Sequence, residues 1–327
     1  MLRHRKPQFL DSRQFVGHVV PKKAFSTYEK QGMTSLAKQL QKLAIPGQPS
    51  LRQVVSKKKP SLLFDPKEAS DIDTDTIFSI GVNGLEELIS IDSSFTEFET
   101  SLFQESCKDF ERTVQMKEVL EDVDKKVTSF LRRLSPYFLL KPAQKCLEWL
   151  IRAFRINSFN VDAIMECILP YYETKLFAHV VQLLPLKDPS STWHWLRSIQ
   201  KAGSPLSKLT LVQHCISVQS FLVFVCEMVP HSLKVHKHSP ASAPRTVVAF
   251  YASTVLGVLE TASSINEELI SRLLPFIIKG LKSSNVEYRA ASYMVTSQLT
   301  TLAKLQEQLY SSLIETICKV LSYSPVC

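Results

Sequence analysis

The segment LLPFIIKGLKSSNVEYRAASYMVTSQLTTLA, residues 273–303, reads as two helices joined by a short turn. Two serine–glutamate pairs with the spacing of a capping box, Ser264 with Glu267 and Ser284 with Glu287, predict where these helices begin. Apolar side chains recur every three or four positions in the first helix, and this stripe is too broad for one neighbour to cover. A hairpin of this kind needs stacked neighbours, so the segment predicts a helical repeat array.

Other residues of this hairpin suit structural roles in such an array. Pro275 lies inside the first helix, where a proline removes one backbone hydrogen bond and bends the helix axis. Ala290 and Ala291 are small enough for two helices to approach closely, and we expect Arg289 to reach an acidic or carbonyl partner in the adjoining repeat. The predicted repeat-structural residues are Pro275, Ser284, Glu287, Arg289, Ala290 and Ala291.

The composition of the whole chain favours an all-α fold. It holds only eight glycines in 327 residues, and strand-rich folds and phosphate-binding loops both need glycine for tight turns. A proline–aromatic step recurs at Pro136-Tyr137, Pro170-Tyr171 and Pro275-Phe276, at separations of 34 and 105 residues, which are close to one and three repeat lengths. We therefore predict an all-α fold, a HEAT/armadillo-like α-solenoid of stacked helical hairpins.

Periodicity and charge divide the chain into three regions. Residues 1–32 lack sustained periodicity and carry seven Lys and Arg against two acidic residues, which predicts a disordered basic extension. Residues 33–60 are predicted to form a short helix and a Lys-rich linker, and residues 61–327 degenerate HEAT-like helical repeats, of which 264–303 is the clearest unit. Because most of the net charge of +8 lies in the extension, it does not imply nucleic-acid binding over the whole body.

The sequence contains none of the common signatures of phosphate-binding loops, zinc proteases or hydrolases. Residues 231–245 are histidine-rich and are predicted to form an exposed loop, without the cysteines or carboxylates that would complete a metal site. We therefore predict no catalytic, cofactor-binding or metal-binding residues, no membrane partner and no small-molecule substrate. An enzyme with an unrecognised site is the alternative, and it would need a concave pocket holding an acid–base pair.

Six basic residues around two predicted helices are the candidates for phosphate contact. Asp124 and Glu148 lie among them, so a solvated face of mixed charge is the alternative. The candidates are Arg132, Arg133, Lys141, Lys145, Arg152 and Arg155.

The hairpin at 264–303 resembles a HEAT repeat, with a proline in its first helix and YRAA at the start of its second. Three longer segments resemble the N-terminal region of the HEAT repeat-containing protein 1 family, whose members are large nucleolar scaffolds of the small subunit processome, associated with the U3 snoRNP. These segments are SLLFDPKEASDIDTDTIFSIGVNGLEELISIDSSFTEFE (61–99), LSPYFLLKPAQKCLEWLIRAFRI (134–156) and GLKSSNVEYRAASYM (280–294).

The resemblance implies a non-enzymatic scaffold in the nucleus and nucleolus that supports ribosome biogenesis, through pre-rRNA transcription and early 18S rRNA processing. It implies other processome proteins as partners, with U3 snoRNP and pre-rRNA as direct or indirect ones. A protein-binding adaptor of another pathway, such as nuclear transport, is the alternative. The resemblance begins at Met33 and the family continues for many more repeats, so we expect residues 1–32 to be an extension and the SYSPVC ending to mark an incomplete or alternatively ended product.

Overall fold

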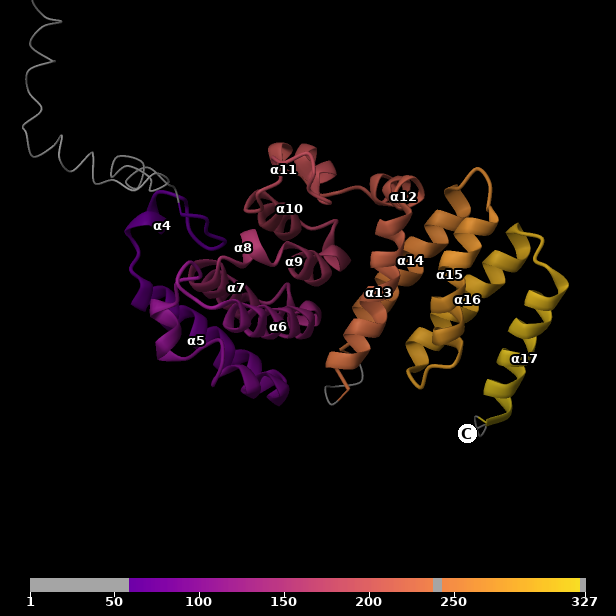
Figure 1. Cartoon of the computed structure of the whole chain (residues 1–327), viewed down its shortest axis with the longest axis horizontal. Helices are drawn as coiled ribbons and strands as arrows, with labels where there is room; N and C mark the ends of the chain where they lie inside the picture. The colour runs from indigo at the N-terminus through magenta and orange to yellow at the C-terminus, as the bar shows by residue number, and fades with distance from the viewer. Residues whose placement is uncertain (1–58, 238–242, 324–327) are drawn as a thin grey trace, which may run out of the picture. The chain divides into compact units, whose positions relative to one another are not determined.

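The computed structural model describes residues 59–237 and 243–323. All described residues belong to one compact unit, Lys58–Cys327. The predicted basic extension (1–32) and nearly all of the predicted short helix and linker (33–60) lie outside the described residues. Every described helix is an α-helix or a 3₁₀-helix, and no strand occurs among the described residues (Figure 1). This confirms the all-α prediction.

The N-terminal part of this unit consists of helices of very unequal length, separated by 3₁₀ turns. Its α-helices are α4 (Glu68–Asp71), α5 (Thr74–Ile91), α6 (Lys117–Leu134), α7 (Lys141–Phe154), α8 (Ile156–Phe159), α9 (Val161–Ile168), α10 (Lys175–Gln182) and α11 (Arg197–Ala202). Its 3₁₀ turns are η1 (Ser93–Phe98), η2 (Glu105–Asp109), η3 (Ser135–Tyr137), η4 (Leu169–Tyr171) and η5 (His194–Leu196).

The C-terminal part consists mostly of helices of 15 to 17 residues. They are α12 (Lys208–Ser217), α13 (Gln219–Val235), α14 (Arg245–Thr261), α15 (Glu267–Leu281), α16 (Val286–Leu302) and α17 (Glu307–Tyr323). No single described helix is long and apolar enough to cross a membrane, and α12 with α13 passes that test only as a pair bent by 113°.

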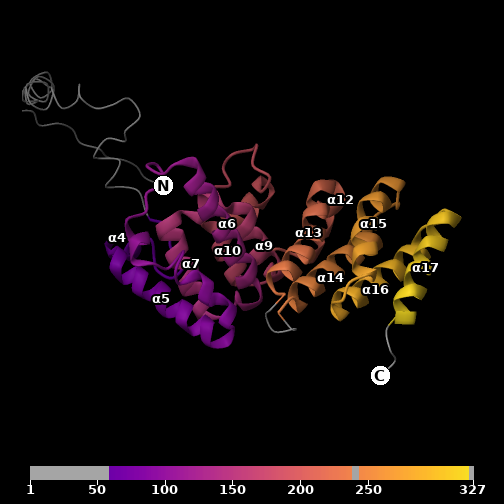
Figure 2. The same cartoon turned by 60° about the horizontal axis from the view of Figure 1, so that its bottom comes forward.

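The C-terminal helices stack in chain order as hairpins (Figures 1 and 2). Helix α13 packs on α14 and on α15, while α15 packs on α16 and on α17. Helix α14 in turn packs on α16, so α13, α15 and α17 form one layer and α14 and α16 a second. Two layers of alternating helices are the arrangement of a HEAT-like solenoid, which confirms the predicted fold class.

The N-terminal part is built around the pair α5 and α7, which pack closely because α5 carries two glycines. A Cβ atom placed on Gly81 would lie 2.5 Å from the Cβ atom of Trp149, and one on Gly84 would lie 2.7 Å from the carbonyl oxygen of Pro142. Helix α6 packs on α9 and also on α13, and it therefore connects the N-terminal part to the C-terminal array.

The predicted capping boxes are wrong, although both helices exist. Helix α16 begins at Val286, and its cap is Asn285, whose Oδ1 accepts a hydrogen bond from the backbone N–H of Tyr288 at 2.9 Å. Asn266 caps α15 in the same way, with the N–H of Leu269 as donor at 2.9 Å. Asparagine is at least as good a cap as serine, so the neighbouring asparagines take the positions predicted for Ser264 and Ser284.

The two helices of the hairpin approach closely at Gly280 and Ser292, whereas the prediction placed this close approach at Ala290 and Ala291. Gly280 of α15 meets Ser292 of α16 so closely that a Cβ atom on Gly280 would lie 1.8 Å from the Ser292 Oγ. Ala291 is buried, whereas Ala290 is exposed. Pro275 lies inside α15 and is exposed, and the bend expected of it stays a prediction.

Arg289 does not reach the adjoining repeat, contrary to the prediction. Its guanidinium NH1 donates to the carbonyl oxygen of Ser283 at 3.3 Å, and Ser283 lies in the turn of the same hairpin. Glu287, which was predicted to complete a capping box, pairs instead with Arg245 of α14 at 2.7 Å. The contact between repeats is therefore made by Glu287 rather than by Arg289.

Candidate functional site

The six basic residues predicted to contact phosphate do not form one surface. Lys145 lies on α7 and faces α5, where its Nζ lies 2.6 Å from both Asn83 Oδ1 and Glu87 Oε1. Arg152, two turns further along α7, donates to the carbonyl oxygen of Ala69 at 2.6 Å. Both charges are therefore used in contacts within the fold rather than presented to a ligand.

Of three further candidates, Arg133 is paired within the fold, whereas Lys141 and Arg155 point to solvent. Arg133 pairs with Glu97 at 3.0 Å and lies over the ring of Phe98, so its charge is also opposed. Lys141 and Arg155 are exposed at the two ends of α7, and within the described residues neither side chain has an ion-pair partner. Phosphate contact stays a prediction, and at these two residues no ion pair among the described residues competes with it.

The sixth residue, Arg132, belongs to a buried ionic cluster that sequence analysis missed. The carboxylate of Glu166 on α9 is 8% exposed and accepts hydrogen bonds from Nε and NH2 of Arg132, the second at 3.1 Å. It also lies 2.7 Å from Nδ1 of His231 on α13. Burial alone raises the pKa of Glu166, but the hydrogen bonds from His231 and Arg132 outweigh burial and lower the pKa below its ordinary value.

Glu166 therefore stays ionised and holds three helices, α6, α9 and α13, at one point. The cluster joins residues that are 34 and 65 positions apart, and no local motif announces it. The separation of 34 residues between Arg132 and Glu166 equals that between the first two proline–aromatic steps, so the repeat length was the signal that could have paired them.

The predicted exposed loop at 231–245 is wrong over its first residues. Helix α13 continues through Pro230 to Val235 and places His231 inside the helix. An apolar spacing of four residues, at Val225, Val229 and Leu233, continues past the proline and indicated this extension.

The second histidine of that segment is buried at the end of α13. His236 is 5% exposed, and its Nδ1 and Nε2 lie 2.9 Å and 3.2 Å from the carbonyl oxygens of Ser232 and Arg133. Burial lowers the pKa of His236 below its ordinary value. The contact with Arg133 joins the end of α13 to the end of α6. His238 lies outside the described residues.

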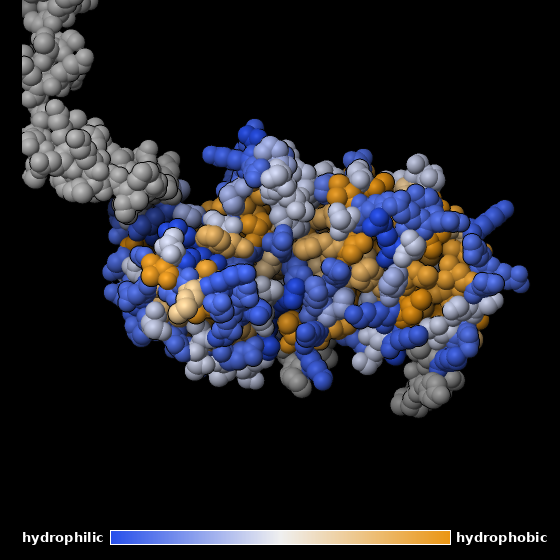
Figure 3. Space-filling model, in the orientation of Figure 1, coloured by the Kyte–Doolittle hydropathy of each residue, from blue (hydrophilic) through white to orange (hydrophobic). Residues whose placement is uncertain are grey.

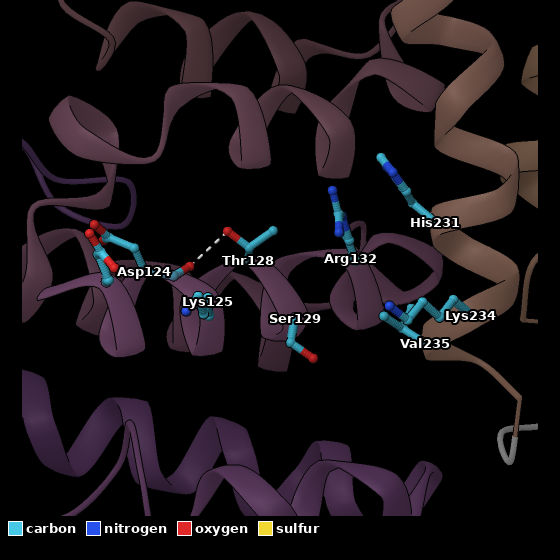
Figure 4. A pocket seen from close by; sticks show the side chains of 9 residues that line it. Asp124, Lys125, Thr128, Ser129, Arg132, His231, Lys234 and Val235 are labelled. Atoms are coloured by element: carbon cyan, nitrogen blue, oxygen red, sulfur yellow. Dashed lines mark hydrogen bonds between the residues drawn. The ribbon is translucent and has the colours of Figure 1, made fainter. Parts of the chain in front are cut away.

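Beside the cluster of Glu166, Arg132 and His231, an open groove of about 490 Å³ lies between α6 and α13. We call it the α6–α13 groove. Figure 4 shows its side chains in order along α6, from Asp124 at one end to Arg132 and His231 at the other. The lining residues are Glu121, Asp124, Lys125, Thr128, Ser129, Arg132, His231, Lys234 and Val235.

The two ends of the groove differ in charge. At one end, Asp124 is paired with Arg112 and accepts a hydrogen bond from Asn160 Nδ2 at 3.0 Å. Burial raises the pKa of Asp124, but these two partners outweigh it and lower the pKa, so the carboxylate stays charged. Glu121 lies at the same end, 3.7 Å from Lys117.

The other end of the groove is basic. Arg132 uses Nε and NH2 for Glu166, which leaves NH1 for a ligand, and His231 uses Nδ1, which leaves Nε2. Lys234 is exposed at this end, whereas Lys125, which is also exposed, lies about two turns before Arg132, next to Asp124 (Figure 4). Neither lysine has an ion-pair partner in the part of the chain that the structure describes. Chemically, this end of the groove can hold an anionic group.

A second groove, of about 360 Å³, lies between α14 and α16. Its lining is mostly apolar and small, and the pair Arg245–Glu287 bounds it. On the face drawn in Figure 3, apolar side chains gather over the C-terminal helices, whereas hydrophilic ones cover most of the N-terminal part. The two charged residues of this groove, Arg245 and Glu287, pair with each other, so they do not specify what would cover it.

The described cysteines and the other metal-binding residue types form no reactive or metal-binding cluster. Cys146, Cys167, Cys215 and Cys226 are buried, and burial raises the pKa of all four thiols, that of Cys215 to about 12. Across residues 59–237 and 243–323, no three His, Cys, Asp or Glu residues are grouped so as to hold a metal ion.

Known proteins resemble this chain over most of its length. A family profile described as U3 small nucleolar RNA-associated protein 10 matches residues 269–325. HEAT repeat-containing protein 1 of Homo sapiens is 46% identical over 295 residues, which are 90% of this chain and 14% of that protein. Its counterpart in Danio rerio is 44% identical over 90% of this chain and 14% of its own length.

More distant relatives show the same pattern. The Meyerozyma guilliermondii protein named U3 small nucleolar RNA-associated protein 10 is 32% identical over 80% of this chain and 14% of its own length. The chain thus spans about one seventh of the length of these relatives. The resemblance read from the sequence is confirmed: over nine tenths of its length, this chain is homologous to the HEAT repeat-containing protein 1 family.

Proposed function

We propose that this chain is a non-enzymatic helical-repeat scaffold of the small subunit processome, acting in the nucleolus. The homology over nine tenths of the chain carries the proposal, because two groups of relatives bear names that refer to HEAT repeats and to the U3 small nucleolar RNA. In this role the chain supports ribosome biogenesis, through pre-rRNA transcription and early processing of 18S rRNA.

The fold supports a role in holding other molecules. Stacked hairpins present long surfaces and grooves along which partners bind, and such arrays are common scaffolds. The partners proposed are other processome proteins, with U3 snoRNP and pre-rRNA reached directly or through them.

The charge distribution favours proteins as the immediate partners of the described residues. Three of the six candidate phosphate-contacting residues, Arg133, Lys145 and Arg152, are committed to contacts inside the fold, and Arg132 uses two of its three guanidinium nitrogens in the same way. A protein surface that binds the phosphate backbone of RNA needs several Lys or Arg side chains that are not already paired with carboxylates. The reason is that neutralising the phosphates supplies most of the affinity.

The test is purification of the tagged full chain from nuclear extract, with and without nuclease, followed by identification of the bound proteins and RNA. Processome proteins that remain bound after nuclease treatment are the expected result. Their loss on nuclease treatment would show that RNA forms the bridge. Recovery of transport receptors in place of processome proteins would favour the adaptor alternative and overturn the proposal. The tag alone, carried through the same steps, is the control.

A further inference from the structure

We propose that the α6–α13 groove binds an acidic segment of a partner protein. The inference names the kind of segment that the scaffold holds and rests on the proposed function in that respect. It is carried by the geometry of the groove, in which Arg132, His231 and Lys234 gather around one end and Lys125 lies further along the same groove, next to Asp124.

Two of these side chains are held in place before any ligand arrives. Glu166 fixes the guanidinium of Arg132 through Nε and NH2, and it fixes the ring of His231 through Nδ1. The atoms left over, NH1 and Nε2, belong to residues that line the groove. Because these side chains are already ordered, a ligand that binds them loses less of its binding free energy to fixing rotamers.

The two other side chains supply charge that the fold does not use. Lys125 projects from α6 and Lys234 from α13, so they come from opposite walls of the groove (Figure 4). Both are exposed, and among the described residues neither is paired with a carboxylate. An acidic segment lying between the walls can place one carboxylate near Lys234 and Arg132 and another near Lys125, further along α6.

The opposite end of the groove argues for a peptide rather than a nucleic acid. Glu121 and Asp124 lie there, on the same wall as Lys125 and Arg132. A nucleic-acid strand carries a negative charge at every nucleotide, and following the groove would bring phosphates against these carboxylates. A peptide can place acidic residues beside the basic side chains alone, and a volume of about 490 Å³ accommodates a few side chains.

The test measures binding of a fluorescein-labelled dodecapeptide of alternating glutamate and serine to the purified full chain, by fluorescence anisotropy at low salt. The same peptide with glutamine in place of glutamate is the ligand control. We expect saturable binding of the glutamate peptide, and a loss of about tenfold in affinity in the double variant Lys125→Glu/Lys234→Glu, because two attractive contacts become repulsive.

A matched variant separates the groove from general electrostatics. Lys279→Glu/Lys282→Glu changes the net charge by the same amount at exposed lysines outside the groove, and it should bind the peptide as the unaltered chain does. Circular dichroism of both variants checks that the fold is kept, as expected for exposed residues.

Several outcomes would overturn the proposal: no binding of the glutamate peptide, equal binding of the glutamine peptide, or equal loss in the two double variants. A dodecamer of oligouridylate that binds more tightly than the peptide, and loses its affinity in Lys125→Glu/Lys234→Glu alone, would assign the groove to RNA instead. These measurements use purified chain, so a failure here leaves the processome association, which is tested in nuclear extract, to stand or fall separately.

Discussion

The N-terminal part (α4–α11) and the C-terminal array (α12–α17) are both all-α, yet different interactions hold them together. In the N-terminal part, buried charges fix distant segments. Glu148 is fully buried and accepts hydrogen bonds from Ser61 Oγ and from the N–H of Leu62, and Glu166 binds Arg132 and, from the C-terminal array, His231.

The C-terminal array places its ion pairs on the surface. Those of Arg245 with Glu287 and of Arg272 with Glu268 have side chains that are 39% to 66% exposed. Its packing comes from apolar stripes and close contacts such as Gly280 with Ser292. Regular hairpins therefore specify their own stacking, whereas short irregular helices need buried hydrogen bonds and ion pairs to fix their positions.

The strongest test of this comparison is Glu166→Ala. The change leaves Arg132 largely buried without its partner, and breaking a buried pair in this way should lower the free energy of unfolding by about 3 kcal/mol. Glu287→Ala removes an exposed pair and should cost less than about 1 kcal/mol. Urea unfolding of both variants measures the difference, and equal losses would remove the distinction between the two parts.

The same residue predicts a dependence on pH. The pKa of Glu166 is lower in the folded chain than its ordinary value of 4.5, so the folded state favours the charged form. Its stabilising contribution is therefore complete above pH 4.5 and is lost as the pH falls through the lower, folded-state pKa. The stability advantage of the unaltered chain over Glu166→Gln should shrink as the pH falls below 4.5. A difference that grows on acidification would contradict the assignment.

The next largest effect is expected inside the C-terminal array. Gly280→Ala places a Cβ atom 1.8 Å from Ser292 Oγ, so the hairpin must shift, and overpacking of this kind costs about 1–3 kcal/mol. Ser292→Ala removes the clashing oxygen and should restore part of the loss in the double variant. Thermal unfolding of the two single variants and the double variant completes the cycle, and strictly additive effects would show that the two residues do not meet.

A smaller effect should distinguish the observed cap from the predicted one. Asn285→Ala removes the acceptor for the N–H of Tyr288 and should lower the free energy of unfolding by about 1 kcal/mol. Ser284→Ala is the matched control and should leave it almost unchanged, because the cap of α16 is Asn285. The reverse order, measured in the same denaturation experiment, would restore the capping box.

The smallest effect is expected for Arg289→Ala. Among the described residues its side chain makes one hydrogen bond, of 3.3 Å, to the Ser283 carbonyl in a half-buried turn, so the loss should stay below about 1 kcal/mol. A loss above 2 kcal/mol in urea unfolding would indicate that Arg289 bridges repeats after all, and would make the array more dependent on polar ties than described.

Sequence reasoning was most successful where structure is periodic. The helices α15 and α16 and the all-α class follow from apolar spacing, which depends on residues close in the chain. Their caps were misplaced by one or two residues, because Asn266 and Asn285 stand beside the serines that fit the capping-box pattern. Local patterns therefore identified the elements better than their ends.

The candidate site was largely beyond reach of the sequence. Arg132 was predicted as a free cation that contacts phosphate, although it pairs with Glu166. This pairing could not be foreseen, because Glu166 lies 34 residues after Arg132 and His231 lies 65 residues after Glu166. Which cations stay unopposed depends on such distant contacts. Lys125 and Lys234 have no sequence feature that separates them from other lysines, and only the packing of α6 on α13 brings them to one groove.

The attachment of three helices to Glu166 has a consequence for synthesis on the ribosome. Arg132 and Glu166 leave the exit tunnel together with the N-terminal part, but His231 follows 65 residues later. One oxygen of the carboxylate therefore lacks its histidine partner until α13 has been made and has docked on α6. The hairpin α15–α16, in contrast, carries its caps and its close contact within 37 consecutive residues, from Asn266 to Leu302, and can assemble as soon as it emerges. Nascent chains should thus complete the N-terminal part late and add the later hairpins one at a time.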